Sequence, residues 1–253
     1  MKKEDTSAGQ NLIAACLITG VFDVNRTEIL PDNDPEPFLA WADSLRRLQL
    51  RGVLFHNNLS PALCESMESA HLRLVRISYD TRWNPNVYRY TIYHEFLQRE
   101  GPQIAHVFFT DVSDVVVLKN PFTDPDFYLH PTTLFCGDEP KNLDNDWMKA
   151  HSTHLRSQIA DYAQFEEKWK DSPLLNCGII GGSRAVMTEC IGALHHIHTQ
   201  YNHNNTTAYT GDMGAFNYLA RTRFSDRLRH GVPVNTVFKA YQTSDETCWF
   251  RHK

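Results

Sequence analysis

The sequence lacks the motifs that mark several common protein classes. Its six cysteines are scattered and include no Cys-x-x-Cys pair, so a thiolate zinc site is not expected. It has no Gly-x-Ser-x-Gly element and no Gly-x-x-x-x-Gly-Lys-Ser/Thr loop, which leaves hydrolase and P-loop kinase functions without a starting motif. Internal repeats and low-complexity tracts are also missing, which disfavours a repeat protein.

Positive charge and long apolar runs are scarce as well. The formal net charge is -5, so no overall basic field is available to hold a nucleic acid. The apolar run at residues 11–19 contains Asn11, soon meets Asp23 and is too short to cross a bilayer. The start of the chain shows no clear signal-peptide layout. The sequence therefore predicts a cytoplasmic protein with no integral membrane segment and no nucleic-acid partner.

What the chain does contain is enough apolar residues for a large core. Of its 253 residues, 42% are hydrophobic, including 14 Phe and 10 Tyr. A chain of this size folds without needing a disulfide or a metal to hold it together. Strand-length apolar runs alternate with longer amphipathic stretches, a pattern typical of βαβ units and a largely parallel sheet. Because no linker divides the sequence, residues 1–253 are expected to form a single α/β domain.

The same pattern predicts individual elements. We expect strands at 11–19, 53–56, 72–77, 104–110, 134–136 and 174–181. We expect helices at 38–50, from 61 onward, and at 86–99, 147–169, 185–201 and 212–220. The Gly–Gly pair after residue 180 is interpreted as a turn, and the tail from about residue 232 as irregular.

The most informative segment is HVFFTDVSDVVVLKNPF, in which a buried-type strand ends in Asp111 and Asp114. Ligands of open α/β sheets bind beyond the carboxyl ends of the strands. Two carboxylates placed there repel each other unless a cation neutralises them, and Mg²⁺ and Mn²⁺ prefer oxygen ligands. The alternative is a simple turn, since Asp and Ser also cap turns and helices locally.

This segment resembles the "DxD" region of the GT-A-fold nucleotide-diphospho-sugar glycosyltransferases, although its spacing is D-x-x-D. The resemblance implies a Rossmann-like domain with a central mixed, mostly parallel sheet. It also implies that about residues 11–120 bind the nucleotide and about 121–253 face the acceptor. By the same resemblance Asp114 ligates Mn²⁺ or Mg²⁺, and Asp111 contacts the ribose or shares the metal.

Two further segments resemble parts of these enzymes in the expected order. NVYRYTIY resembles the region that carries a basic residue towards the nucleotide, which assigns that role to Arg89. The alternative for Arg89 is an ordinary exposed helix residue. LLNCGIIGGSR resembles the strand that brings an Asn and glycines beside the donor sugar, which places Asn176 there.

The end of the chain completes the predicted site. TGDMGAFN resembles an acid-bearing helix start, so Asp212 is expected to bind sugar hydroxyls or act as the base for the acceptor. The alternative is helix capping. The resemblance further implies that His252 is a third metal ligand and that Lys253 meets the diphosphate. His195 and His198 lie three residues apart and are expected on a solvated helix face, like the arginines near residues 221–229.

Taken together, the sequence predicts a metal-dependent glycosyltransferase with a nucleotide-sugar donor, UDP first and GDP next. The acceptor stays open among glycan, protein, lipid and small molecule, as does the choice between retention and inversion. One alternative is a sugar-phosphate nucleotidyltransferase, although its Gly-rich basic loop is not evident at residues 19–26. Another is a non-catalytic carbohydrate-binding module on the same fold.

Overall fold

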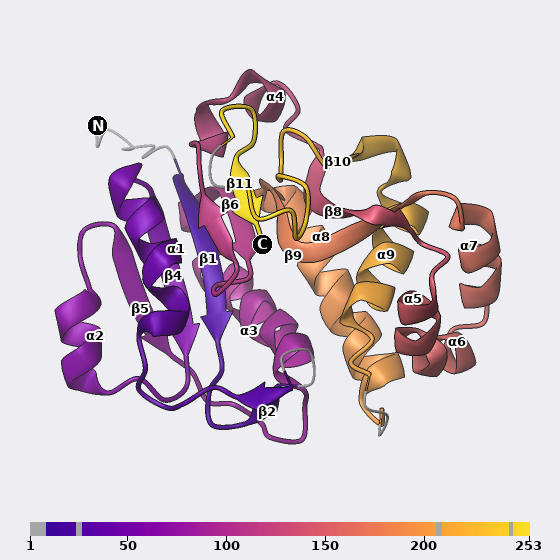
Figure 1. Cartoon of the computed structure of the whole chain (residues 1–253), viewed down its shortest axis with the longest axis horizontal. Helices are drawn as coiled ribbons and strands as arrows, with labels where there is room; N and C mark the ends of the chain where they lie inside the picture. Colours follow the sequence, from indigo (N-terminus) through magenta and orange to yellow (C-terminus); the bar gives the residue numbers. More distant parts are fainter. Residues whose placement is uncertain (1–8, 24–26, 206–208, 243–244) are drawn as a thin grey trace, which may run out of the picture.

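A computed structural model describes residues 9–23, 27–205, 209–242 and 245–253. Its centre is a seven-stranded sheet with the order β10-β8-β9-β6-β1-β4-β5 (Figure 1). These strands are β1 (Gln10–Leu17), β4 (Arg51–His56), β5 (Leu72–Arg76), β6 (Ile104–Thr110), β8 (Leu134–Asn142), β9 (Pro173–Ser183) and β10 (Leu228–His230).

The strand directions make the sheet mixed but mostly parallel. β6, β1, β4 and β5 run parallel to one another, and β10 runs parallel to β8. Only β9 is reversed, since it pairs antiparallel with both β6 and β8. The predicted α/β class and the mixed, mostly parallel sheet are therefore confirmed, and the arrangement is compatible with one Rossmann-like domain.

Helices pack on both faces of this sheet. The long ones are α1 (Glu36–Arg47), α3 (Pro85–Glu100), α8 (Arg184–Ile197) and α9 (Asp212–Arg223). The short ones are α2 (Pro61–Met67), α4 (Pro125–Tyr128), α5 (Asp146–His151), α6 (Thr153–Gln158) and α7 (Tyr162–Trp169). No helix among the described residues is long and apolar enough to cross a membrane.

Alternating residues of β1 feed two separate cores. Leu12 and Ala14 join the cluster that contains buried residues of α3, α8 and α9. Ile13 and Ala15 join the cluster on the opposite face, with buried residues of α1. This period of two follows from the pleat of the strand, and it explains why β1 is apolar on both sides.

Four short strands lie outside the central sheet. β2 (Phe22–Asp23) pairs with β3 (Glu28–Ile29), and β7 (Val115–Val117) pairs antiparallel with β11 (Phe250–His252). The expectation of a wholly irregular tail is therefore wrong. The tail forms β11, which pairs with the segment that follows the acidic motif.

Residues 147–169 are largely helical, as expected, but the helix is divided into α5, α6 and α7, and the hydroxyl of Tyr162 in α7 donates a buried hydrogen bond to Ser152, between α5 and α6, at 3.1 Å. One local prediction fails for a tertiary reason. Gly181 and Gly182 do not form a turn but continue β9. A Cβ on Gly181 would lie 2.1 Å from the ring of Phe108, so a close approach between elements requires glycine there.

Candidate functional site

A cavity of about 470 Å³ lies beyond the carboxyl ends of β1 and β6. Its lining includes residues 16–18 at the end of β1, residues 111–114 directly after β6, and residues 176–178 of β9. Asp212, at the start of α9, and His252, in β11, also line the cavity. The cavity therefore has the position in which open α/β sheets bind ligands, and it collects segments from both halves of the chain.

The three predicted metal ligands meet in this cavity. Asp111, Asp114 and His252 each offer one ligand atom, and these atoms all lie within 4.8 Å of one another. His252 reaches the acids because β11 pairs with β7, which sets it opposite Val115. The backbone N–H of Lys253 donates to the carbonyl of Asp114 at 3.0 Å and fixes the same alignment. Pairing of two short strands thus builds the cluster.

The geometry of the cluster is suited to a small divalent cation. The Nε2 atom of His252 lies 3.7 Å from Oδ2 of Asp114, which is too far for a hydrogen bond. Its Nδ1 atom is buried and has no hydrogen-bond partner among the described residues. Ligands at about 2.1 Å from Mg²⁺ lie about 3.0 to 4.2 Å apart in an octahedron. Two carboxylates and an imidazole could therefore hold Mg²⁺ or Mn²⁺ after small movements.

Gly178 leaves room for this cluster. A Cβ at this position would lie 2.6 Å from Oδ2 of Asp111, 2.7 Å from Cε1 of His252 and 3.0 Å from Oδ1 of Asn176. The backbone of Gly178 also connects the same groups, since its carbonyl accepts from the N–H of Asp111 at 2.7 Å and its N–H donates to Asn176 at 2.7 Å. The residue therefore both aligns the acids and keeps the space between them open.

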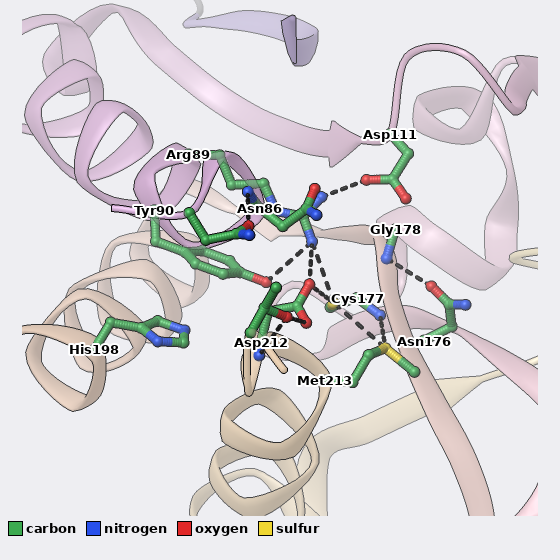
Figure 2. A network of polar contacts seen from close by, with 12 residues as sticks. Asn86, Arg89, Tyr90, Asp111, Asn176, Cys177, Gly178, His198, Asp212 and Met213 are labelled. Carbon is green, nitrogen blue, oxygen red and sulfur yellow. Dashed lines mark hydrogen bonds and ion pairs between the residues drawn. The ribbon is translucent and has the colours of Figure 1, made fainter. Parts of the chain in front are cut away.

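Arg89 is buried between two acids and is not an exposed helix residue (Figure 2). One of its guanidinium nitrogens contacts Oδ1 of Asp111, and the other lies 3.4 Å from Oδ2 of Asp212. Burial by itself lowers the pKa of Arg89, but Tyr90 and the two nearby carboxylates outweigh it and hold the pKa well above its usual value. The guanidinium therefore supplies a permanent positive charge that fixes both carboxylates.

Asp212 is more enclosed than its predicted role as a base requires. Its exposed fraction is 4%, and Oδ1 accepts a hydrogen bond from the hydroxyl of Thr210 at 2.6 Å. Oδ2 faces Arg89. Both carboxylate oxygens are thus already engaged, an arrangement that suits a fixed negative charge better than a group that accepts a proton.

Asn176, which the sequence predicted, forms a polar pair with Glu139, which it did not. Asn176 donates its amide N–H to Glu139 at 2.9 Å and accepts from the backbone of Gly178, so its amide is held at both ends. Glu139 lines the same cavity. Burial raises the pKa of Glu139 above its usual value, although the hydrogen bond from Asn176 opposes the change. No sequence motif marks Glu139, which enters the cavity only because β8 pairs with β9.

The cavity also has lysines, but not the one expected. Lys253 is exposed, and the described lining contains Lys141 and Lys239 instead. These two lysines add positive charge to the cavity lining, which favours anionic ligands.

The histidines of α8 and its extension behave differently from a solvated face. His198 is 2% exposed and stacks on Tyr90 with ring centroids 5.2 Å apart. Burial lowers its pKa to about 4. Arg221 is also buried, and it donates to the carbonyl of Pro173 at 2.7 Å. The expectation of a solvated face is therefore wrong for His198 and Arg221, which pack against Tyr90 and β9, whereas Arg223 and Arg229 are exposed as expected.

Comparisons with known proteins leave the family open. No protein-family model matches this sequence, and no curated protein matches it. Function therefore has to be argued from the cavity itself.

Proposed function

We propose that the protein is a divalent-cation-dependent glycosyltransferase that uses a nucleotide-diphosphate sugar, with UDP as the first donor to test and GDP as the second. The observation that carries the proposal is the meeting of Asp111, Asp114 and His252 on the wall of a cavity at the end of β6. The resemblance of the acidic motif to the GT-A enzymes and the mixed, mostly parallel sheet support it.

The charges around the cavity suit a diphosphate donor. A bound Mn²⁺ or Mg²⁺ would supply Lewis-acid stabilisation of charge on the departing nucleoside diphosphate. Lys141 and Lys239 attract the phosphates from the opposite half of the chain. Arg89 keeps Asp111 oriented towards the cluster through one carboxylate oxygen. Its part in this proposal is to position the acids, because the guanidinium is already engaged with both of them.

Proton transfer falls to Glu139 rather than to Asp212. Glu139 has a raised pKa and lines the cavity, whereas Asp212 is held by Thr210 and Arg89. Glu139 and Asp212 therefore have different surroundings, and the two carboxylates suit different tasks. Glu139 accepts the proton of the attacking hydroxyl, and Asp212 contributes a fixed negative charge beside the sugar.

The proposal is tested by thermal unfolding with UDP and GDP, each with and without Mn²⁺. A ligand that binds the folded form raises the melting temperature, and at one hundred times its dissociation constant it adds about 2.7 kcal/mol of stability. We expect stabilisation by UDP that requires Mn²⁺, and its loss in Asp114→Asn. Asp43→Asn is the matched control, because Asp43 is 66% exposed and pairs with Arg46 on the surface, away from the cavity.

Further outcomes separate the alternatives. Metal-dependent release of UDP from a UDP-sugar supports a transferase. Formation of a sugar nucleotide from a sugar phosphate and a nucleoside triphosphate would show a nucleotidyltransferase instead. Sugar binding without either reaction would show a carbohydrate-binding module. A chain that responds to no nucleotide in the presence of Mn²⁺ contradicts the proposal.

A further inference from the structure

Three aromatic side chains form a continuous row in the lining of the cavity, in which the first two rings are stacked and the third is tilted by 47° from its neighbour. Trp147 and His151 are one helical turn apart on α5, and their ring centroids lie 3.6 Å apart with an interplanar angle of 24°. Tyr209, which precedes α9, continues the row at 4.5 Å from His151. We refer to Trp147, His151 and Tyr209 as the aromatic shelf. Because all three residues line the cavity that holds the acidic cluster, the shelf belongs to the same binding space.

The two outer rings of the shelf are partly exposed to solvent, unlike most large aromatic side chains of the described residues. Trp147 is 41% exposed and Tyr209 is 40% exposed, whereas Trp41 and Trp249 are completely buried. Between them, burial lowers the pKa of His151, so its ring is neutral at neutral pH. The shelf is therefore an uncharged, partly exposed aromatic surface inside a cavity whose lining also carries charged and polar side chains.

The chemistry around the shelf indicates what fits on it. The faces of aromatic rings are electron-rich and attract polarised C–H groups. Glu139, Asn176 and Lys141 line the same cavity and offer hydrogen-bond donors and acceptors. A ligand that satisfies both sets has a flat C–H face and a rim of hydroxyl groups. A pyranose ring has that shape, whereas a lipid chain would leave the polar groups unpaired.

The position of the shelf assigns this sugar to the acceptor side. Its residues come from α5 and from the segment before α9, in the second half of the chain. Tyr209 lies immediately before the Thr210 that hydrogen-bonds to Asp212, and the charge of Asp212 acts on His151. Another part of the lining, residues 16–18, Asp23 and Asn86, comes from the half expected to hold the nucleotide.

We propose that the aromatic shelf binds a pyranose ring of the acceptor by stacking, so that the acceptor is a glycan or glycoside. Calling this sugar the acceptor rests on the proposed function, but the sugar site itself does not. Binding of a pyranose to the shelf requires neither the cation nor the nucleotide.

Saturation-transfer NMR tests the proposal with the intact chain and no added metal. The probes are the methyl β-glycosides of glucose, galactose and N-acetylglucosamine, with mannitol as an acyclic polyol control. We expect pyranose signals in which protons of one ring face are saturated more than those of the other, and little signal from mannitol. Trp147→Ala and Tyr209→Ala should each weaken binding about tenfold or more. Tyr128→Ala is the control, because Tyr128 is 52% exposed and lies outside the described cavity lining.

Parallel titration of each variant with UDP and Mn²⁺ distinguishes the two proposals. Loss of pyranose binding in the shelf variants with retained UDP binding supports the acceptor site. If pyranosides bind at the shelf but UDP and Mn²⁺ do not bind at all, the transferase proposal fails and the sugar site remains. No pyranose binding, equal binding by the shelf variants, or a loss of UDP binding specific to Trp147→Ala overturns the shelf proposal. The last outcome would assign the rings to a nucleobase.

Discussion

Replacing Gly178 with alanine is the sharpest test of how the acidic cluster is built. The new methyl group would lie 2.6 Å from Asp111 Oδ2, 2.7 Å from His252 Cε1 and 3.0 Å from Asn176 Oδ1. Real Cβ atoms do not approach other atoms as closely as the two shorter distances, so those two groups have to move. Both belong to proposed metal ligands, and the backbone of Gly178 is itself hydrogen-bonded to Asp111 and Asn176, which limits how far it can shift.

The expected size of the effect follows from this crowding. Overpacking a tight site typically destabilises a protein by about 1–3 kcal/mol. Displacing the groups that orient metal ligands typically lowers metal affinity about tenfold to a hundredfold. We therefore expect Gly178→Ala to remain folded with a lower melting temperature, and to bind Mn²⁺ at least about tenfold more weakly than the wild type.

Two measurements and one matched variant make the test specific. Free Mn²⁺ is followed by electron paramagnetic resonance during titration, and unfolding is followed by circular dichroism. Gly192→Ala is the control, because a Cβ there meets nothing closer than 3.9 Å and the residue lies inside α8. Alanine favours a helix interior over glycine by about 1 kcal/mol, so the control should be neutral or slightly more stable.

The reasoning would be refuted by a Gly178→Ala protein that binds Mn²⁺ as tightly as the wild type. That result would mean that the bound cation does not lie between Asp111 and His252. A Gly178→Ala protein that fails to fold would also contradict the expected loss of only about 1–3 kcal/mol.

Three other substitutions test neighbouring parts of the site. Arg89→Met leaves the buried carboxylate of Asp212 without its cation. The free energy of unfolding, measured in urea, should therefore fall by about 3–5 kcal/mol, and a fall below about 1 kcal/mol would contradict the assigned ion pairs. Glu139→Gln removes the proposed proton acceptor, so turnover of a UDP-sugar should fall by about a hundredfold or more while UDP and Mn²⁺ binding is retained, and unchanged turnover would reject that role. His198 has a pKa of about 4 in the folded chain against 6.5 ordinarily, so the unfolded chain binds more protons and stability should fall as pH drops from about 6.5 to about 4, by at most about 1.4 kcal/mol per pH unit. Unfolding of His198→Phe across that range should have a shallower slope than the wild type, and identical slopes would show that the histidine is not buried in its neutral form.

Much of the fold could be read from local pattern alone. The strand predicted at residues 104–110 is β6 residue for residue, and the helices expected near 38–50 and 86–99 correspond to α1 and α3. These elements have the apolar period of their type and clear end signals, such as the Asn84 side chain that caps α3. Elements whose ends depend on distant contacts were predicted less well, as the division of 147–169 into α5, α6 and α7 shows.

The site divides in the same way. A buried strand that ends in Asp111 and Asp114 can be recognised in the sequence, because the carboxyl end of a parallel strand faces the ligand side of the sheet. The burial of Arg89 between two acids could not be recognised, because Asp212 is 123 residues further along the chain. Glu139 and the aromatic shelf were missed because their positions depend on how β8, α5 and the start of α9 pack.

The amino-acid sequence by itself determined the class of the fold, the mostly parallel sheet and the position of the acids at the end of β6. Those properties depend on the local alternation of apolar and polar residues, which is present in the sequence itself. Only the tertiary structure decided which groups meet the acids: the pairing of β7 with β11 brings His252 opposite Val115, and the reversal of β9 brings Gly178 and Asn176 beside Asp111. Such meetings depend on long-range packing, whose energy is shared by residues far apart in the chain and leaves no local signal.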